Sequence, residues 1–178
     1  RMTNPPPEFS RPVRLDHIGR HVDPVTIGAD ATERAALVRR FGLIALDRLE
    51  ADYALSQEEG AIIARGRVRA DLTQPCVATG GPVPERIDSP FTLRFVAESD
   101  TVEEIELDAE DCDTIGYEGG VIDMGEAVAE TMALVMAPYP RTPDADAVLK
   151  DAGVLSEEQA SPFAALLALR GQGQADKD

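Results

Sequence analysis

The sequence lacks tryptophan, and aromatic residues make up only 4% of its 178 residues. Its core must therefore be built mainly from aliphatic side chains. Two cysteines are too few for a disulfide framework. No apolar run approaches the roughly 18 residues that a membrane span requires, and residues 1–7 contain no apolar signal core. These absences predict a cytoplasmic protein without disulfides or a membrane segment.

The sequence also lacks the patterns that mark metal sites. His17 and His21 are its two histidines, but their segment is predicted as strand and loop, not as the helix that would join them at a zinc ion. The acidic residues 108–113 lack the regular spacing and central glycine of a calcium-binding loop. No glycine-rich phosphate loop is present. We therefore predict no metal-binding and no cofactor-binding residue.

The cysteines offer the one route to covalent catalysis. Cys76 is a single thiol in a loop rich in proline and glycine, and no base is placed beside it by the sequence. A small buried residue is the main interpretation, and a cysteine nucleophile is the minor one. Cys112 lies among acids, which blunt the reactivity of a thiol. We therefore predict no catalytic residue, and a protein that is not an enzyme.

Charge is divided unequally along the chain, whose net charge is -16. Residues 1–97 contain 13 Lys/Arg and 13 Asp/Glu, whereas residues 98–178 contain 4 and 20, so the second part carries the whole excess. Phosphate contacts dominate nucleic-acid affinity, so an acidic chain is a poor generic binder of nucleic acid. The neutral first part can still present a local basic face. The acidic part either keeps the protein in solution or attracts a basic partner.

The fold class predicted from these patterns is α+β. Strands are expected over residues 13–18, 43–55, 61–73, 86–97 and 113–117, and short turns between the central strands favour a curved antiparallel meander that is open or closed into a barrel. A helix over residues 31–41 follows the capping residues Asp30 and Glu33 and ends at Gly42. A second helix follows Asp123 and ends before Pro138. Two to three helices are expected on one side of the sheet.

Three regions are predicted along the chain. Residues 1–12 form a flexible, proline-rich leader, and residues 13–140 form one α+β domain. Residues 141–178 form an acidic segment with a helical turn near residues 145–150, a short helix over residues 161–170 and a flexible tail. Residues 98–113 are read as a solvated loop or an exposed edge. The apolar face of the last helix, formed by Phe163, Leu166 and Leu167, docks either on the body of the fold or on a partner.

The strongest candidate for a binding site is a stripe of arginines. Arg65, Arg67 and Arg69 alternate with apolar residues, which places them on one strand face about 7 Å apart. Arginine binds phosphate in a bidentate manner, so the stripe, together with Arg86 and Arg94, is a candidate RNA-binding or partner-binding surface. The alternative is a solvent face whose arginines pair with Glu50, Asp52 or Asp71. No aromatic residues interleave with the stripe, which disfavours sequence-specific RNA readout.

Four short motifs, in order, resemble a known family. They lie at residues 70–77 with the following 82–83, and at residues 121–128, 134–140 and 161–169. Together they are similar to the YceD-like family, the large ribosomal RNA subunit accumulation proteins. The resemblance implies a non-enzymatic role in 23S ribosomal RNA accumulation or large-subunit biogenesis. The implied partners are ribosomal RNA or a large-subunit precursor. A protein-interaction module, or a chaperone for a basic ribosomal protein without direct RNA contact, is the alternative.

The sequence departs from the family pattern at its cysteines. Many members have a second cysteine shortly after the first, but Cys76 is followed by Val77, Ala78 and Thr79. Residues 141–160 also contain no cysteine. These departures argue against a metal site in this chain, and no cofactor and no small-molecule substrate is evident from the sequence.

Overall fold

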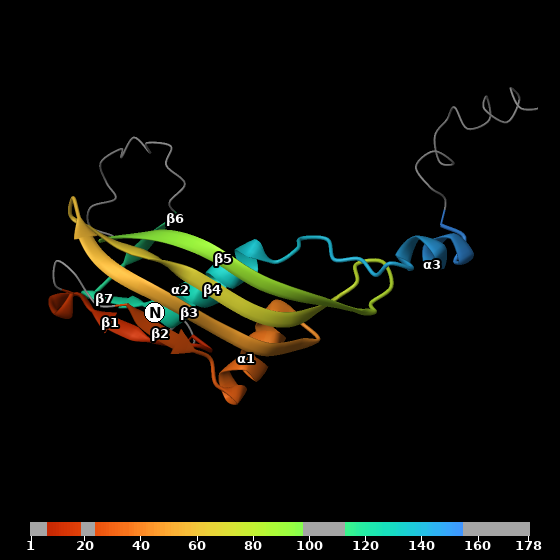
Figure 1. The fold of residues 1–178 in the computed structure, drawn as a ribbon, viewed down its shortest axis with the longest axis horizontal. Helices are drawn as coiled ribbons and strands as arrows, with labels where there is room; N and C mark the ends of the chain where they lie inside the picture. The colour runs from red at the N-terminus through yellow and green to blue at the C-terminus, as the bar shows by residue number, and fades with distance from the viewer. Residues whose placement is uncertain (1–6, 19–23, 98–112, 155–178) are drawn as a thin grey trace, which may run out of the picture.

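The computed structural model describes residues 7–18, 24–97 and 113–154 (Figure 1). The strands are β1 (Pro12–Arg14), β2 (Val25–Gly28), β3 (Ala45–Glu58), β4 (Ala61–Pro75), β5 (Pro82–Ala97), β6 (Asp113–Tyr117) and β7 (Val121–Asp123). The helices are α1 (Ala31–Phe41), α2 (Met124–Val135), α3 (Ala145–Asp151) and the short 3-10 helix η1 (Leu15–His17). The predicted α+β class is confirmed.

The main sheet has five strands in the order β2-β3-β4-β5-β6, and β1 pairs separately with β7. The β3–β4 turn consists of Glu59 and Gly60, whose positive φ angles of 47° and 82° suit a two-residue hairpin. The sheet is open, because β2 and β6 lie at opposite edges, so closure into a barrel does not occur. The prediction of an antiparallel meander was also wrong for the last strand, because β6 pairs with β5 in parallel.

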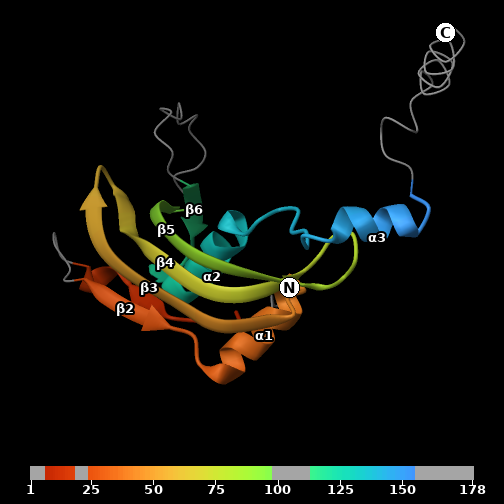
Figure 2. The same cartoon turned by 45° about the vertical axis from the view of Figure 1, so that its right-hand side comes forward.

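The inner face of the sheet carries the core. Helix α2 packs against β4 and β5 on this face, and α1 packs against β3 (Figure 2). Gly66 interrupts the buried row of β4, and a Cβ atom there would lie 2.2 Å from the carbonyl oxygen of Asp52 and 2.9 Å from the ring of Phe91. Tyr53 and Phe91, its partners on the two neighbouring strands, cover the glycine. The predicted inward row was otherwise confirmed: Ile62, Ala64, Val68, Ala70 and Leu72 are all buried.

Helix ends follow the local signals in the sequence. The side chain of Asp30 accepts hydrogen bonds from the backbone N–H groups of Thr32 and Glu33, and Glu33 accepts one from the N–H of Asp30. Gly42 ends α1 in the left-handed conformation, with φ of 64°. Asp123 caps α2 by accepting from Gly125 and Glu126. The predicted boundaries of α1 are confirmed, because its signals lie within a few residues of each end. The helical turn predicted near residues 145–150 is also confirmed as α3, although no side chain caps its start.

The N-terminal segment differs from its prediction. The structure describes only residues 7–12 of the leader predicted over residues 1–12, and there Phe9 is 0% exposed and the backbone N–H of Arg11 donates to Asp123 at 2.7 Å. The strand predicted over residues 13–18 is only β1, followed by η1. Its partner is β7, more than a hundred residues away, with Val13 opposite Ile122. Because the partner of this segment is so distant in the sequence, the neighbouring residues give no indication that the segment is ordered.

Several predictions lie outside the described residues. They concern His21, Cys112, residues 98–112 of the acidic loop, and the segment 161–170 with Phe163, Leu166 and Leu167. In the described ranges, no helix has the length and apolar character needed to cross a membrane.

Candidate functional site

The outer face of β3, β4 and β5 concentrates charged side chains. Residues that alternate with the buried ones point away from the helices, so the same periodicity that builds the core also builds this face. We call it the polar face. Its charged residues are Arg48, Arg65, Arg67, Arg69, Arg86 and Arg94, together with Glu50, Asp52, Glu58, Asp71 and Asp88.

Strand register places opposite charges side by side on the polar face. Asp71 on β4 lies between Arg48 on β3 and Arg86 on β5 in the register. Its two carboxylate oxygens accept hydrogen bonds from the Nε atoms of Arg48 at 2.8 Å and Arg86 at 2.9 Å. These hydrogen bonds, with that from Arg86 the stronger, lower the pKa of Asp71. One carboxylate therefore joins all three long strands.

The predicted stripe is present, and each of its arginines has a carboxylate partner. Arg65 donates to Glu58 at 2.6 Å and lowers the pKa of that carboxyl to about 2, with a smaller effect from Ser56. Arg67 donates through Nε to Asp88 at 2.8 Å. Arg69 donates to Asp52 and, with help from Thr26, lowers the pKa of that carboxyl.

The structure brings all five predicted arginines onto one face. Arg86 is the most open of them, with its side chain 79% exposed. Within the described residues, Arg94 forms no ion pair. Sequence reasoning missed Arg48, Glu58 and Asp88. Arg48 could have been found from its two-residue spacing with Glu50 and Asp52, whereas Asp88 depends on strand register.

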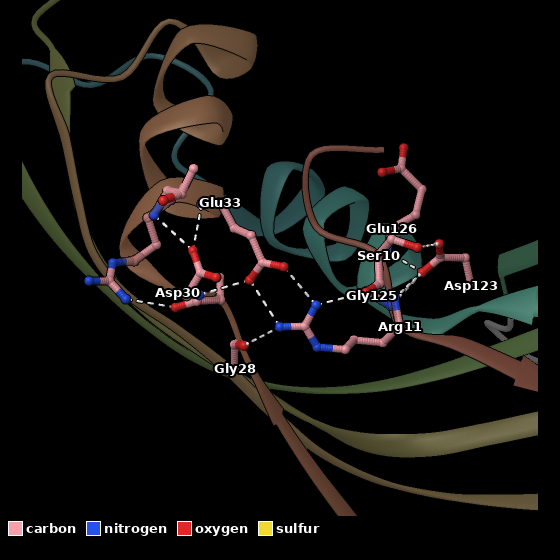
Figure 3. Close-up of polar contacts among 11 residues, drawn as sticks. Ser10, Arg11, Gly28, Asp30, Glu33, Asp123, Gly125 and Glu126 are labelled. Carbon is pink, nitrogen blue, oxygen red and sulfur yellow. Dashed lines mark hydrogen bonds and ion pairs between the residues drawn. The ribbon is translucent and has the colours of Figure 1, made fainter. Parts of the chain in front are cut away.

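A second set of charges binds the N-terminal segment (Figure 3). We call it the N-terminal clamp, formed by Arg11, Glu33, Arg40, Asp123 and Glu126. Arg11 donates to both oxygens of Glu33, at 2.7 and 2.9 Å, and to the carbonyl of Gly28 at 2.9 Å. These hydrogen bonds lower the pKa of Glu33. The guanidinium thereby joins the segment before β1 to β2 and α1.

Contacts of Arg40 and the close approach at Gly125 complete the N-terminal clamp. Arg40 of α1 donates to both oxygens of Glu126 in α2, at 2.8 and 2.6 Å, and to Glu8 at 2.9 Å. Gly125 lets the backbone of residues 9–11 approach, since a Cβ atom there would lie 2.5 Å from the carbonyl oxygen of Phe9. These groups hold one another in place, so we assign the clamp a structural role.

Cys76 lies in the connection between β4 and β5 and is buried. Its Sγ accepts hydrogen bonds from the backbone N–H and the hydroxyl of Thr142, at 3.4 and 3.6 Å. A hydrogen bond from the hydroxyl of Thr79, followed by those from Thr142, lowers the pKa of the thiol to about 6, against the opposing effect of burial. Among the described residues, no three His, Cys, Asp or Glu side chains are grouped to hold a metal. Cys76 thus joins the hairpin to the segment after α2.

Comparison with known proteins places the chain in a family. A family model described as "Large ribosomal RNA subunit accumulation protein YceD" matches residues 64–170. No curated protein and no solved structure gives a significant match. The family match covers more than half of the chain, so the chain belongs to the YceD family, as its motifs predicted. Membership implies a role in the accumulation of large-subunit ribosomal RNA.

Proposed function

From membership of the YceD family and the charges of the polar face, we propose that this chain is a non-enzymatic, cytoplasmic factor in large-subunit biogenesis. It supports accumulation of the ribosomal RNA by binding a basic protein of the precursor particle. The observation that supports this partner is the alternation of charge on the polar face. Asp71 lies between two arginines, and Arg69 lies within reach of both Asp52 and Asp88.

The balance of charge favours a protein partner over a phosphate backbone. The polar face carries six arginines and five carboxylates, so its excess is a single positive charge. Binding to a phosphate backbone depends on many uncompensated cations. A surface of alternating charge is instead suited to a complementary protein surface, where opposite charges fix the register. The net charge of -16 would also attract a basic protein at long range.

Direct contact with ribosomal RNA is the second candidate function. It is favoured by the open position of Arg86 and by Arg94, which has no ion pair within the described part of the chain. Exposed ion pairs contribute little to stability, so a phosphate could replace a carboxylate beside Arg65, Arg67 or Arg69 at small cost. The planar guanidinium suits a phosphate as well as a carboxylate.

Sedimentation of cell lysate tests whether the polar face binds the particle. We expect the protein to travel with large-subunit precursors, and a variant with Arg65, Arg67 and Arg69 changed to Glu to remain at the top of the gradient. Arg14→Glu is the matched control, because Arg14 is also an exposed, ion-paired arginine but lies outside the polar face. Equal sedimentation of the triple variant and the wild type would exclude the polar face as the binding surface.

A second variant separates the two partners. Changing Asp52, Asp71 and Asp88 to Asn removes negative charge from the polar face and keeps its arginines. A protein partner that binds both signs should be lost from this variant, and binding should survive ribonuclease treatment. An RNA partner should bind the same variant more tightly, with a steep dependence on salt, and nuclease should release it.

A further inference from the structure

Strand β5 forms an edge of the main sheet over most of its length. In the part of the chain that the structure describes, β6 pairs with β5 only at residues 93–97 (Figure 1). Residues 82–92 pair with β4 on one side, and no described strand pairs with them on the other. An unpaired edge of this length is a template onto which another strand can add, so proteins commonly guard such edges.

The register shows which backbone groups of β5 face this open edge. The N–H of Cys76 donates to the carbonyl of Gly81 at 2.7 Å, and these two residues continue the register of β4 with β5. Along an antiparallel pair of strands, hydrogen-bonded residue pairs alternate with pairs that are not bonded. The odd-numbered residues of β5 therefore bond to β4. The even-numbered residues direct their N–H and carbonyl groups to the open edge.

Prolines occupy three of the six even-numbered positions in residues 82–92. They are Pro82, Pro84 and Pro90, and all three are exposed. Proline has no N–H group, so these positions offer no donor to a further strand, and the proline ring lies where the donor would be. At an odd-numbered position a proline would instead remove a hydrogen bond to β4. The prolines are thus placed where they leave the sheet intact and block its edge.

The charges beside the open edge are complementary to those of a second copy of the chain. Two copies of β5 that paired antiparallel about Ile87 would place Arg86 of each copy opposite Asp88 of the other. Opposite charges on facing residues stabilise a pair of strands. The same register would place Pro84 opposite Pro90, where neither residue can donate a hydrogen bond. The pairing that the charges favour is therefore the one that the prolines prevent.

We infer that Pro84 and Pro90 keep the chain from pairing with a second copy of itself through β5. Arg86 and Asp88 belong to the polar face, so such a pair would join two polar faces edge to edge. The prolines keep each polar face on a separate molecule. The inference concerns the backbone edge of β5 and does not depend on the function proposed for the polar face.

Sedimentation velocity over a range of protein concentrations tests this inference. The wild type should remain a monomer. In the Pro84→Thr/Pro90→Thr variant, each copy gains two N–H donors at the edge, and threonine favours strands. We expect its dimer to have a dissociation constant about thirtyfold or more below the lower limit for the wild type, since four backbone hydrogen bonds become possible. Pro138→Thr/Pro143→Thr is the matched control, because both prolines are exposed and lie outside β5, and it should remain a monomer.

Charge reversal tests whether the new dimer uses the expected register. In the Pro84→Thr/Pro90→Thr chain, Asp88→Arg would place two arginines opposite each other at two symmetric positions. The dimer should weaken by about fivefold or more. Adding Arg86→Asp places opposite charges together again and should restore it. Circular dichroism and urea midpoints should show that each variant folds.

A folded Pro84→Thr/Pro90→Thr variant that remained a monomer would overturn the inference. A dimer that ignored the charge reversal would do so as well, because it would use another surface. The wild type provides a test that needs no variant. In dilute solution, hydrogen exchange should be fast at the backbone amides of Arg86 and Asp88 and slow at those of Ile87 and Ser89. Protection of the first two amides would show that the edge is already paired, against the inference.

Discussion

The N-terminal clamp and the polar face are both built from arginine–carboxylate ion pairs, but the two sets of pairs connect different parts of the fold. Arg11 and Arg40 in the clamp reach carboxylates 22 and 86 positions away, on separate elements. Arg65 and Arg67 on the polar face reach carboxylates 7 and 21 positions away, on neighbouring strands. Strand pairing already holds the second set together. The comparison leads us to expect that an arginine–carboxylate pair stabilises the fold most when its two partners have no other connection.

Single pairs of the two regions also differ in exposure. The side chain of Arg40 is 28% exposed and that of Glu126 is 24%, whereas Arg67 and Asp88 are each about half exposed. Partly buried pairs lose more when one partner is removed, because the remaining charge has less access to water. We therefore expect substitutions in the clamp to change stability, and substitutions on the polar face to change binding.

Of the substitutions considered, Gly125→Ala should lower the free energy of unfolding most, because it displaces the segment that the N-terminal clamp holds. The new Cβ atom would lie 2.5 Å from the carbonyl oxygen of Phe9 and 2.9 Å from the backbone nitrogen of Arg11, so the segment must move. We expect the free energy of unfolding, measured in urea, to fall by about 2–4 kcal/mol. Alanine favours helices, so propensity alone predicts the opposite sign. Gly28→Ala is the control, because its nearest neighbours would lie at an ordinary 3.6 Å; equal losses would contradict the prediction.

Arg40→Ala should have the next largest effect. It leaves Glu8 and Glu126 without their cation, and Glu130 is nearby at 3.8 Å. We expect a loss of about 1–3 kcal/mol in the free energy of unfolding. Arg39→Ala, at the exposed neighbouring position of α1, is the matched control and should cost much less. A loss no larger than that of the control would remove the distinction between clamp and surface.

Acid should weaken the clamp through Glu33. Arg11 holds the pKa of Glu33 below its ordinary value in the folded protein, so the charged form stabilises the fold at neutral pH. This contribution should disappear as the pH falls through the depressed pKa. Glu33→Gln keeps a side chain suited to the capping box and removes the charge. Urea midpoints of the two proteins should differ at neutral pH and converge in acid; a constant gap would argue against a role for the charge.

The smallest change in stability is expected on the polar face. Changing Arg65, Arg67 and Arg69 together to Gln removes their ion pairs with Glu58, Asp52 and Asp88, but the strands that carry them remain paired. The urea midpoint should stay close to that of the wild type, while sedimentation with precursor particles should decrease. If the triple variant unfolded as readily as Arg40→Ala, the polar face would be part of the framework of the fold.

The features predicted from sequence are those with local causes. The limits of α1 follow from Asp30, Glu33 and Gly42, which lie within a turn of the helix ends. The inward and outward rows of β4 follow from a two-residue period. The capping role of Asp123 was also predicted, but not its bonds to Ser10 and Arg11, because those partners are more than a hundred positions away.

The arginines of the candidate site were predicted from the sequence, but much of their pairing with carboxylates was not. Alternation placed Arg65, Arg67 and Arg69 on one face without knowledge of the neighbouring strands. The pairing of Arg67 with Asp88 depends on the register of β4 with β5, which the six-residue connection between them sets. The parallel pairing of β5 with β6 was likewise unpredictable, since short strands do not specify the direction of their neighbours.

The link between Arg11 and Asp123 has a consequence for the order of synthesis. The two residues are 112 positions apart, so residues 8–14 leave the ribosome long before their partners exist. At roughly 5–20 residues per second, the wait lasts about 6–22 s. During that time the side chain of Phe9, fully buried at the end, is available to other molecules. In a nascent chain of this protein, residues 8–14 therefore lack their packing partners until helix α2 has been made.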